Sequence, residues 1–240
     1  MIYFVTPAFE RFALTAVCLE QRKRVIDELA RNGIEARCVV IADDANVAYA
    51  ASLGFDTVER DNEWLGRKFN DGIEYAARHG AEWIVPIGSD SWIDPAYFLP
   101  MPDPALTRSS GMYAVVTAER VGYLDVANPR NPAGPHMIHR SRLPESLRPA
   151  VDERNRYIDS ATLAGLSNVR WELRDLHPLQ YIGFRGHPHI TPYERLWKAW
   201  GVSESTDPWT ELATVYPVDL VERARRSLST APAVTSPAAA

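Results

Sequence analysis

The sequence predicts an α/β fold with a mostly parallel central sheet flanked by helices and an irregular α+β second half. Two observations predict the first half. Short apolar runs, of the kind that form strands buried on both faces, alternate with segments whose apolar residues recur at helical spacing. Turn residues such as Asn32-Gly33 and Gly80 follow the helical segments. This alternation predicts parallel strands joined by right-handed crossovers.

The expected elements of the first half follow one another closely. Strands are expected at 2–5, 38–42, 56–59 and 82–87, and helices at 12–30, 45–52 and 65–79. The segment 88–94 is expected to be a loop. Asp94-Pro95 then has the pattern of a helix N-cap followed by proline at the first helical position.

The second half has weaker periodicity. Strands are expected at 112–117, 121–127, 136–139, 169–173 and 180–184, and helices at 152–166 and 191–200. The segment 227–240 is small, polar and rich in proline, which predicts a disordered tail. We therefore expect a single domain over residues 1–226.

Composition limits the class of protein. The 240 residues are 46% hydrophobic and 24% charged, the balance of a soluble globular protein. The net charge of -5 argues against a nucleic-acid partner. Cys18 and Cys38 are not spaced as a disulfide framework or a zinc site. Without an apolar run of about 18 residues or a basic leader, we expect a cytoplasmic protein with no transmembrane segment.

Polar residues follow three of the predicted strands. They are Thr6, the pair Asp43 and Asp44, and the pair Ser89 and Asp90. Ligands of open parallel sheets bind at the carboxyl ends of the strands. These side chains are therefore expected to meet in one crevice.

Four blocks of the sequence, in this order, carry a family resemblance. They are 5–11 (VTPAFER), 41–44 (IADD), 66–72 (GRKFNDG) and 83–95 (WIVPIGSDSWIDP). Together they resemble the family 2 type of GT-A glycosyltransferases, within the nucleotide-diphospho-sugar transferase superfamily, over about residues 2–166. The resemblance implies a GT-A fold with a nucleotide-binding half at 1–100 and an acceptor-side half at 101–226.

The resemblance also implies an activity. It is transfer of a hexose from a nucleoside-diphosphate sugar to an acceptor hydroxyl, with inversion at the anomeric carbon and a UDP-sugar favoured over a GDP-sugar. The acceptor stays open between a protein, a glycoside and a lipid-linked sugar.

Eleven residues are implied as ligands of the nucleotide sugar. They are Thr6, Pro7, Phe9, Arg11, Asp43, Asp44, Arg67, Lys68, Asn70, Ser89 and Asp90. Simpler interpretations stay open for several of them. Phe9 could be a core residue, Asp43 and Asp90 could serve turns, and Arg67 and Lys68 could form a solvated helix face.

The family holds a divalent cation, Mn²⁺ or Mg²⁺, as a Lewis acid on the leaving diphosphate. Asp90 is the implied ligand. Where the family carries the first carboxylate of Asp-x-Asp, this chain has Gly88. His177 is a candidate to replace it, and the roles of His187 and His189 stay open.

Asp159, in the segment YIDS, resembles the acidic motif of the family and is the candidate general base for the acceptor hydroxyl. Trp92 lies where a sugar ring could stack. A nucleotidyltransferase would need a glycine-rich loop after the first strand, and residues 6–11 contain no glycine. A non-catalytic sugar- or nucleotide-binding relative, acting as an interaction module, is the main alternative because the metal motif is incomplete.

Overall fold

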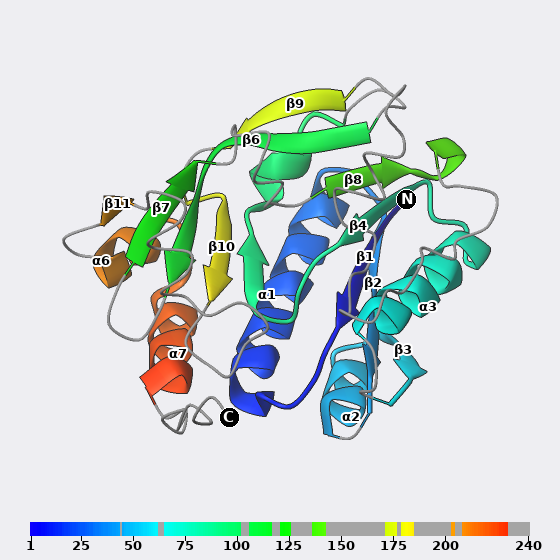
Figure 1. The fold of residues 1–240 in the computed structure, drawn as a ribbon, viewed down its shortest axis with the longest axis horizontal. Helices are drawn as coiled ribbons and strands as arrows, with labels where there is room; N and C mark the ends of the chain where they lie inside the picture. The colour runs from blue at the N-terminus through cyan, green and yellow to red at the C-terminus, as the bar shows by residue number, and fades with distance from the viewer. Residues whose placement is uncertain are drawn as a thin grey trace, which may run out of the picture.

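Four parallel strands form one half of the central sheet (Figure 1). The structure, a computed structural model, describes residues 1–43, 45–61, 65–101, 106–116, 121–125, 136–142, 171–176, 179–184, 203–204 and 208–229. β1 (Ile2–Pro7) lies between β2 (Ala36–Ala42) and β4 (Trp83–Pro86), and β3 (Asp56–Glu59) borders β2. All three of these pairings are parallel. The predicted α/β fold class is confirmed.

Helices cover both faces of these strands. α1 (Phe12–Arg31) packs on one face, where Leu19 and Leu29 meet Ile2 and Phe4 of β1. α3 (Leu65–Arg78) packs on the other face against the alternate residues of the same strand. α2 (Ala45–Ser52) contributes to the layer beside α1. Because successive side chains of a strand point to opposite faces, a strand covered on both sides is apolar throughout.

α3 approaches the sheet most closely at Gly72. A Cβ atom at this position would lie 2.4 Å from both Ile41 Cδ1 and Val5 Cγ1. The glycine that ends the 66–72 block is therefore required by space, because any side chain would overlap the two strands beneath the helix.

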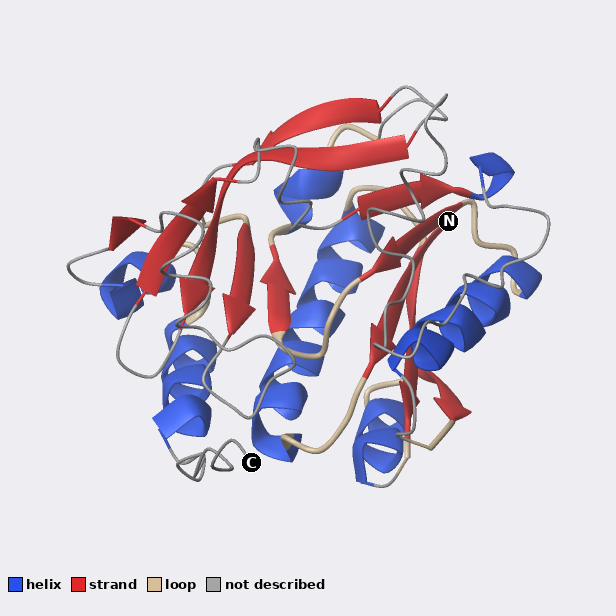
Figure 2. Cartoon of the chain, viewed as in Figure 1, coloured by secondary structure: helices blue, strands red, loops and turns tan. Residues whose placement is uncertain are grey.

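The second half of the sheet is mixed (Figure 2). Beyond β4 the strands run in the order β8, β6, β7 and β11, each antiparallel to its neighbour. β9 and β10 pair in parallel with β6, and β10 also pairs antiparallel with β5. The bounds are β5 (Ser91–Ile93), η1 (Pro95–Phe98), β6 (Leu106–Val116), β7 (Val121–Asp125), β8 (His136–His139), η2 (Arg140–Arg142), β9 (Trp171–Leu176), β10 (Tyr181–Phe184) and β11 (Ser203–Glu204).

Two C-terminal helices pack against each other, and the second of them lies beside α1 (Figure 1). They are α6 (Pro208–Ala213) and α7 (Val218–Ser229). Their apolar side chains form a second core with Leu14 and Cys18 of α1 and with Trp92 and Phe184. None of the helices in the described ranges combines the length and apolar character of a bilayer-spanning segment.

The predicted helices of the first half are confirmed to within one residue at each end. The cap at Asp94 is also confirmed, since its Oδ1 accepts a hydrogen bond from the Ala96 N–H at 2.7 Å, although the helix it starts is a 3-10 turn. Strands 112–117 and 121–127 are confirmed as a pair, with β6 beginning earlier than predicted, at Leu106.

Two expectations need correction, and others stay predictions. The segment 88–94 is not entirely loop, because β5 forms within it against β10. The tail does not begin at 227, because α7 continues to Ser229 and buries Leu228. The helices expected at 152–166 and 191–200 lie outside the described residues, and the single-domain boundary stays a prediction.

Candidate functional site

The loops that follow β1 and β4 begin at the same edge of the sheet. The Ala8 N–H donates to the Ile41 carbonyl at 2.9 Å, and the Ile87 N–H donates to the Val5 carbonyl at 2.9 Å. Each of these bonds continues the hydrogen bonding between parallel strands just beyond the strand end, before the two loops separate. Thr6, Asp43, Ser89 and Asp90 lie at or after the ends of parallel strands and so share this carboxyl edge, whereas Asp44 is outside the described residues. Their convergence on one crevice stays a prediction.

An ion pair joins the two loops. Nη1 of Arg11 lies 3.1 Å from Oδ2 of Asp90, and the two side chains are 20% and 8% exposed. The other carboxylate oxygen, Oδ1, accepts from the Ser91 hydroxyl at 3.1 Å. That hydroxyl in turn accepts from the Tyr181 hydroxyl at 3.3 Å. Both oxygens of Asp90 are therefore engaged by the protein itself.

The loop that carries Arg11 has an unusual backbone. Glu10 and Arg11 have φ values of 45° and 44°, in the left-handed region that residues with a Cβ rarely adopt. Two side chains hold the loop in place: Lys68 Nζ donates to the Ala8 carbonyl at 2.8 Å, and Asn46 Nδ2 donates to the Glu10 carbonyl at 3.3 Å. Conformations of this kind persist when their surroundings fix them, and they concentrate at functional sites.

The interpretation of Lys68 as part of a solvated face is wrong. The side chain is 2% exposed, and its ammonium lies inside the loop, 5.9 Å from the centre of the Phe9 ring. Its neighbour Arg67 is exposed. Phe9 is not a core residue either, because it is 46% exposed. Its ring is therefore accessible at the carboxyl edge.

The remaining predicted ligands differ in accessibility. Thr6 and Pro7 are buried, and Thr6 Oγ1 lies 3.8 Å from Cys38 Sγ, so neither residue is accessible to a ligand in this structure. Ser89 is also buried, whereas Asp43 and Asn70 are half-buried. Asp44, Asp159 and His177 lie outside the described residues, as do His187 and His189.

Two polar side chains of α1 belong to the site but were not predicted. Arg22 is 1% exposed, lies 5.0 Å above the Phe4 ring and donates through Nη2 to the Ser91 carbonyl at 3.2 Å. Gln21 Nε2 donates to the Ile93 carbonyl at 2.8 Å. Burial lowers the pKa of Arg22. The sequence feature that could have indicated the burial of Arg22 is its position, four residues after Cys18 and thus on the apolar face of the helix.

The described residues offer few ligands for the divalent cation that the sequence predicts. Among the residues that the structure describes, there is no group of three His, Cys, Asp or Glu side chains able to hold a cation. A Cβ at Gly88 would lie 2.6 Å from Asp90 Oδ1, so a residue with a side chain at position 88 would require the Asp90 carboxylate to shift. Trp92 is wholly buried, with its ring 4.9 Å from the Phe184 ring, so the expectation that it stacks on a sugar is wrong.

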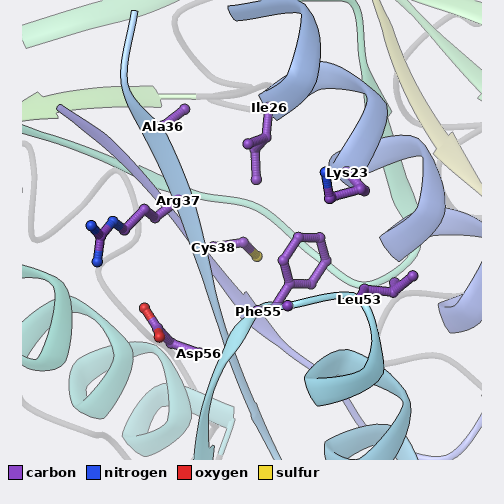
Figure 3. Close-up of a pocket in the computed structure, with 9 residues that line it drawn as sticks. Lys23, Ile26, Ala36, Arg37, Cys38, Leu53, Phe55 and Asp56 are labelled. Atoms are coloured by element: carbon purple, nitrogen blue, oxygen red, sulfur yellow. The ribbon is translucent and has the colours of Figure 1, made fainter. Parts of the chain in front are cut away.

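A cavity of about 290 Å³ lies at the opposite, amino edge of β2 and β3 (Figure 3). Ile26 and Phe55 line it on one side of β2, and Lys23, Arg37 and Asp56 are among its polar residues. Lys23 is paired with Asp27, and Arg37 with Glu35 at 3.3 Å. The cavity is therefore separate from the strand ends that carry the Arg11–Asp90 pair.

The fold resembles that of several solved structures. No protein-family model and no curated protein sequence matches the chain. S. aureus TarS 1–349 in complex with UDP superposes with a TM-score of 0.51 at 14% identity, over 77% of this chain and 60% of that one. A second structure of the same TarS residues gives a TM-score of 0.50 at 14% identity, over 76% and 60%. The catalytic domain of Drosophila beta1,4galactosyltransferase 7 gives a TM-score of 0.43 at 12% identity, over 72% and 63%.

The chain thus shares its fold with TarS 1–349, and the GT-A-like fold predicted from the sequence is confirmed. It spans about 60% of the TarS residues compared. At these identities the likeness shows the fold alone, so the chemistry has to be argued from the site.

Proposed function

We propose that the protein is a glycosyltransferase that moves a sugar from a nucleoside-diphosphate sugar to an acceptor hydroxyl with inversion. The observation that carries the proposal is the Arg11–Asp90 pair, 3.1 Å apart, at the carboxyl edge of the parallel strands. Ligands of such sheets bind at this edge. The likeness to UDP-bound TarS supports a uridine nucleotide as the donor carrier.

The described residues suggest a division of roles. Phe9 offers an exposed ring for a base, and Asp43 at the end of β2 suits the base or ribose. Arg67 and Asn70 lie in the first turns of α3, where the helix dipole favours anions. Lys68 supports the site by holding the Ala8 carbonyl.

Residues outside the described ranges complete the proposal. Asp159 is the proposed general base, because a carboxylate within reach of the acceptor hydroxyl can take its proton as the new bond forms. Asp44 is kept as a second nucleotide ligand. We also keep the predicted cytoplasmic location, with which two buried free thiols are consistent.

A divalent cation fits the described donors poorly. Asp90 is a single carboxylate with Arg11 on one oxygen and Ser91 on the other. His177 stays the sequence-based candidate for a second ligand of Mn²⁺ or Mg²⁺. The glycosyl transfer proposed here does not depend on that ion.

One observation favours a second candidate, a non-catalytic relative that binds a sugar or nucleotide. It is the residue at position 88, where glycine stands in place of the first carboxylate of the family motif. This candidate predicts nucleotide binding without turnover.

Calorimetry with UDP and GDP, with and without Mn²⁺, tests the proposal. We expect UDP to bind and UDP-sugars to be slowly hydrolysed. Asp159→Asn should retain UDP binding and lower turnover about 100- to 10,000-fold, the usual contribution of a general base. Binding of neither nucleotide in any buffer would contradict the proposal. Binding by the wild type without hydrolysis or transfer would favour the non-catalytic relative.

A further inference from the structure

We propose that Arg11, held in place by Asp90, is the cationic group that receives the donor diphosphate, and that Asp90 positions Arg11 instead of binding a metal ion. This inference rests on the proposed function, because it identifies the phosphate-binding cation of the same site.

The first support is the burial of the pair. Asp90 is 8% exposed on its side chain, and a carboxylate in such a place needs a compensating charge. Arg11 supplies that charge at 3.1 Å and is the more exposed partner, at 20%. The anion is therefore inside and the cation faces the edge where ligands bind.

The second support is the chemistry of guanidinium. The group carries five N–H donors in one plane, and contact with Asp90 through Nη1 uses only part of this capacity. The remaining donors match the oxygens of a phosphate, which arginine binds in a bidentate manner. One guanidinium can thus bridge the fixed carboxylate and an incoming diphosphate.

The third support is that the loop after β4 is built around this arrangement. Gly88 leaves room for Asp90 Oδ1, since a Cβ there would approach it to 2.6 Å. The Ser91 and Tyr181 hydroxyls then form a chain that ends on the same oxygen. A metal ion on Asp90 would have to replace these contacts, whereas a diphosphate on Arg11 leaves them intact.

The fourth support is the backbone of the β1–α1 loop. Arg11 adopts φ 44° directly before the twenty-residue helix α1, which has no acidic residue in its first turn. The positive end of a helix adds to the attraction for a phosphate. The left-handed conformation turns the Arg11 side chain toward Asp90, and the buried Lys68 and Asn46 fix the loop in that conformation.

The test is calorimetry with the full chain, using UDP and uridine as probes in EDTA and in Mn²⁺. Wild type should bind UDP with dissociation constants in the two buffers that agree within about threefold. Arg11→Met should weaken UDP binding in EDTA about 10- to 100-fold, the effect of removing a charged hydrogen-bond partner. Uridine, which has no phosphate, should bind both proteins equally, which a general loss of structure would not allow.

A double-mutant cycle then tests the role of Asp90. If Asp90 acts through Arg11, Asp90→Asn should weaken UDP binding, and Arg11→Met/Asp90→Asn should bind UDP no more weakly than Arg11→Met alone. Arg11→Lys, which keeps the charge but not the planar fork, should fall between wild type and Arg11→Met. Arg24→Met is the matched control, since Arg24 is exposed on α1 and lies 3.8 Å from Asp219.

The outcomes separate this inference from the proposed function. UDP binding only in Mn²⁺, lost in Asp90→Asn and retained in Arg11→Met, would overturn the inference and leave the glycosyltransferase standing. Multiplicative effects of the two substitutions would overturn the positioning role of Asp90. Binding of neither UDP nor GDP in any buffer would remove the proposed function, and the inference with it.

Discussion

The two edges of the parallel strands use left-handed backbone in opposite ways. At the amino edge, glycines take it: Gly33 and Gly54 have φ values of 75° and 77° in the turns that lead into β2 and β3. At the carboxyl edge, Glu10 and Arg11 take it. Glycine adopts this region without strain, whereas another residue loses roughly 1–2 kcal/mol. Within the described ranges, the residues other than glycine that adopt this strained conformation thus lie at the edge that carries the proposed site.

The ion pairs at the two edges also differ, because the pair at the carboxyl edge is the more buried one. At the amino edge, Arg37 and Glu35 form an ion pair with side chains 55% and 62% exposed. At the carboxyl edge, the Arg11–Asp90 pair is largely buried. An exposed pair contributes little because solvent screens it, whereas a buried carboxylate depends on its partner. The amino edge should therefore tolerate substitution of its charged residues, whereas the carboxyl edge depends on the particular residues Arg11 and Asp90.

The largest expected effect contrasts one aspartate from each edge. Asp90→Asn should lower turnover about 100-fold or more, because it removes the charge that fixes the cation of the site. Asp56→Asn, which removes the charge of the group that accepts from the Tyr3 hydroxyl beside the cavity, should leave turnover within about twofold. The measurement is kcat/KM for the donor, with urea unfolding to confirm that both variants fold. Equal loss of turnover in the two variants would break the comparison.

The next effect separates glycines needed for space from those needed for conformation. Gly72→Ala should lower the free energy of unfolding by about 2 kcal/mol, the usual result of overpacking, because its methyl group would meet Ile41 and Val5. Gly33→Asn is the control, since nothing lies within 4 Å of a Cβ there and asparagine tolerates positive φ. Urea unfolding of both variants measures the difference. A stability of Gly72→Ala equal to that of wild type would show that α3 can move off the sheet.

A smaller effect concerns an ion pair that belongs to neither edge. Arg223 of α7 donates to both carboxylate oxygens of Glu20 on α1, at 2.6 and 2.5 Å. Glu20→Gln should lower the free energy of unfolding by about 1 kcal/mol at pH 7, since both side chains are partly exposed. Chemical unfolding at several pH values checks both the size and the pH dependence.

The sign of the pH dependence follows from the pKa of Glu20. Hydrogen bonding from Arg223 lowers that pKa below its ordinary value of 4.5. The stabilisation is therefore fully present above about pH 4.5 and is lost as the pH falls through the lowered pKa of the folded state. The difference between wild type and Glu20→Gln should shrink over that acid range. A difference that stays constant down to pH 2 would show that the charge of Glu20 contributes nothing.

The smallest expected effects have opposite signs at the two edges. Glu10→Gly should raise the free energy of unfolding by up to about 1 kcal/mol, because glycine relieves the left-handed strain. Gly54→Ala should lower it by about the same amount. Thermal unfolding of the two variants gives the signs directly. Loss of stability in Glu10→Gly would mean that the Glu10 conformation is not strained.

The parallel half could be predicted from the sequence because its signals are local. Each helix there has its own periodicity and its own stop, so α1 and α3 were placed to within one residue. β5 was missed because its three residues follow Gly88-Ser89-Asp90, which predict a loop, and its pairing partner β10 begins at Tyr181. α6 and α7 are short and follow segments without a clear pattern.

The contact between Arg11 and Asp90 was not predicted. The strand ends indicated Asp90 and the family resemblance indicated Arg11, whereas their pairing depends on two loops 79 residues apart. Lys68 looks exposed in sequence because a lysine usually is. Its burial depends on the Ala8 carbonyl, which sequence periodicity does not describe. A buried polar residue can be recognised only when its partner is known.

The two α1 side chains that hold β5 have a consequence for how the site can evolve. Arg22 and Gln21 bind the carbonyl oxygens of Ser91 and Ile93, and a carbonyl is present whatever the side chain. Substitutions at 91 and 93 can therefore change the chemistry of the strand after Asp90 without releasing these two bonds. The side chains of β5 can therefore change specificity, while these two hydrogen bonds depend on the side chains of Arg22 and Gln21 of α1.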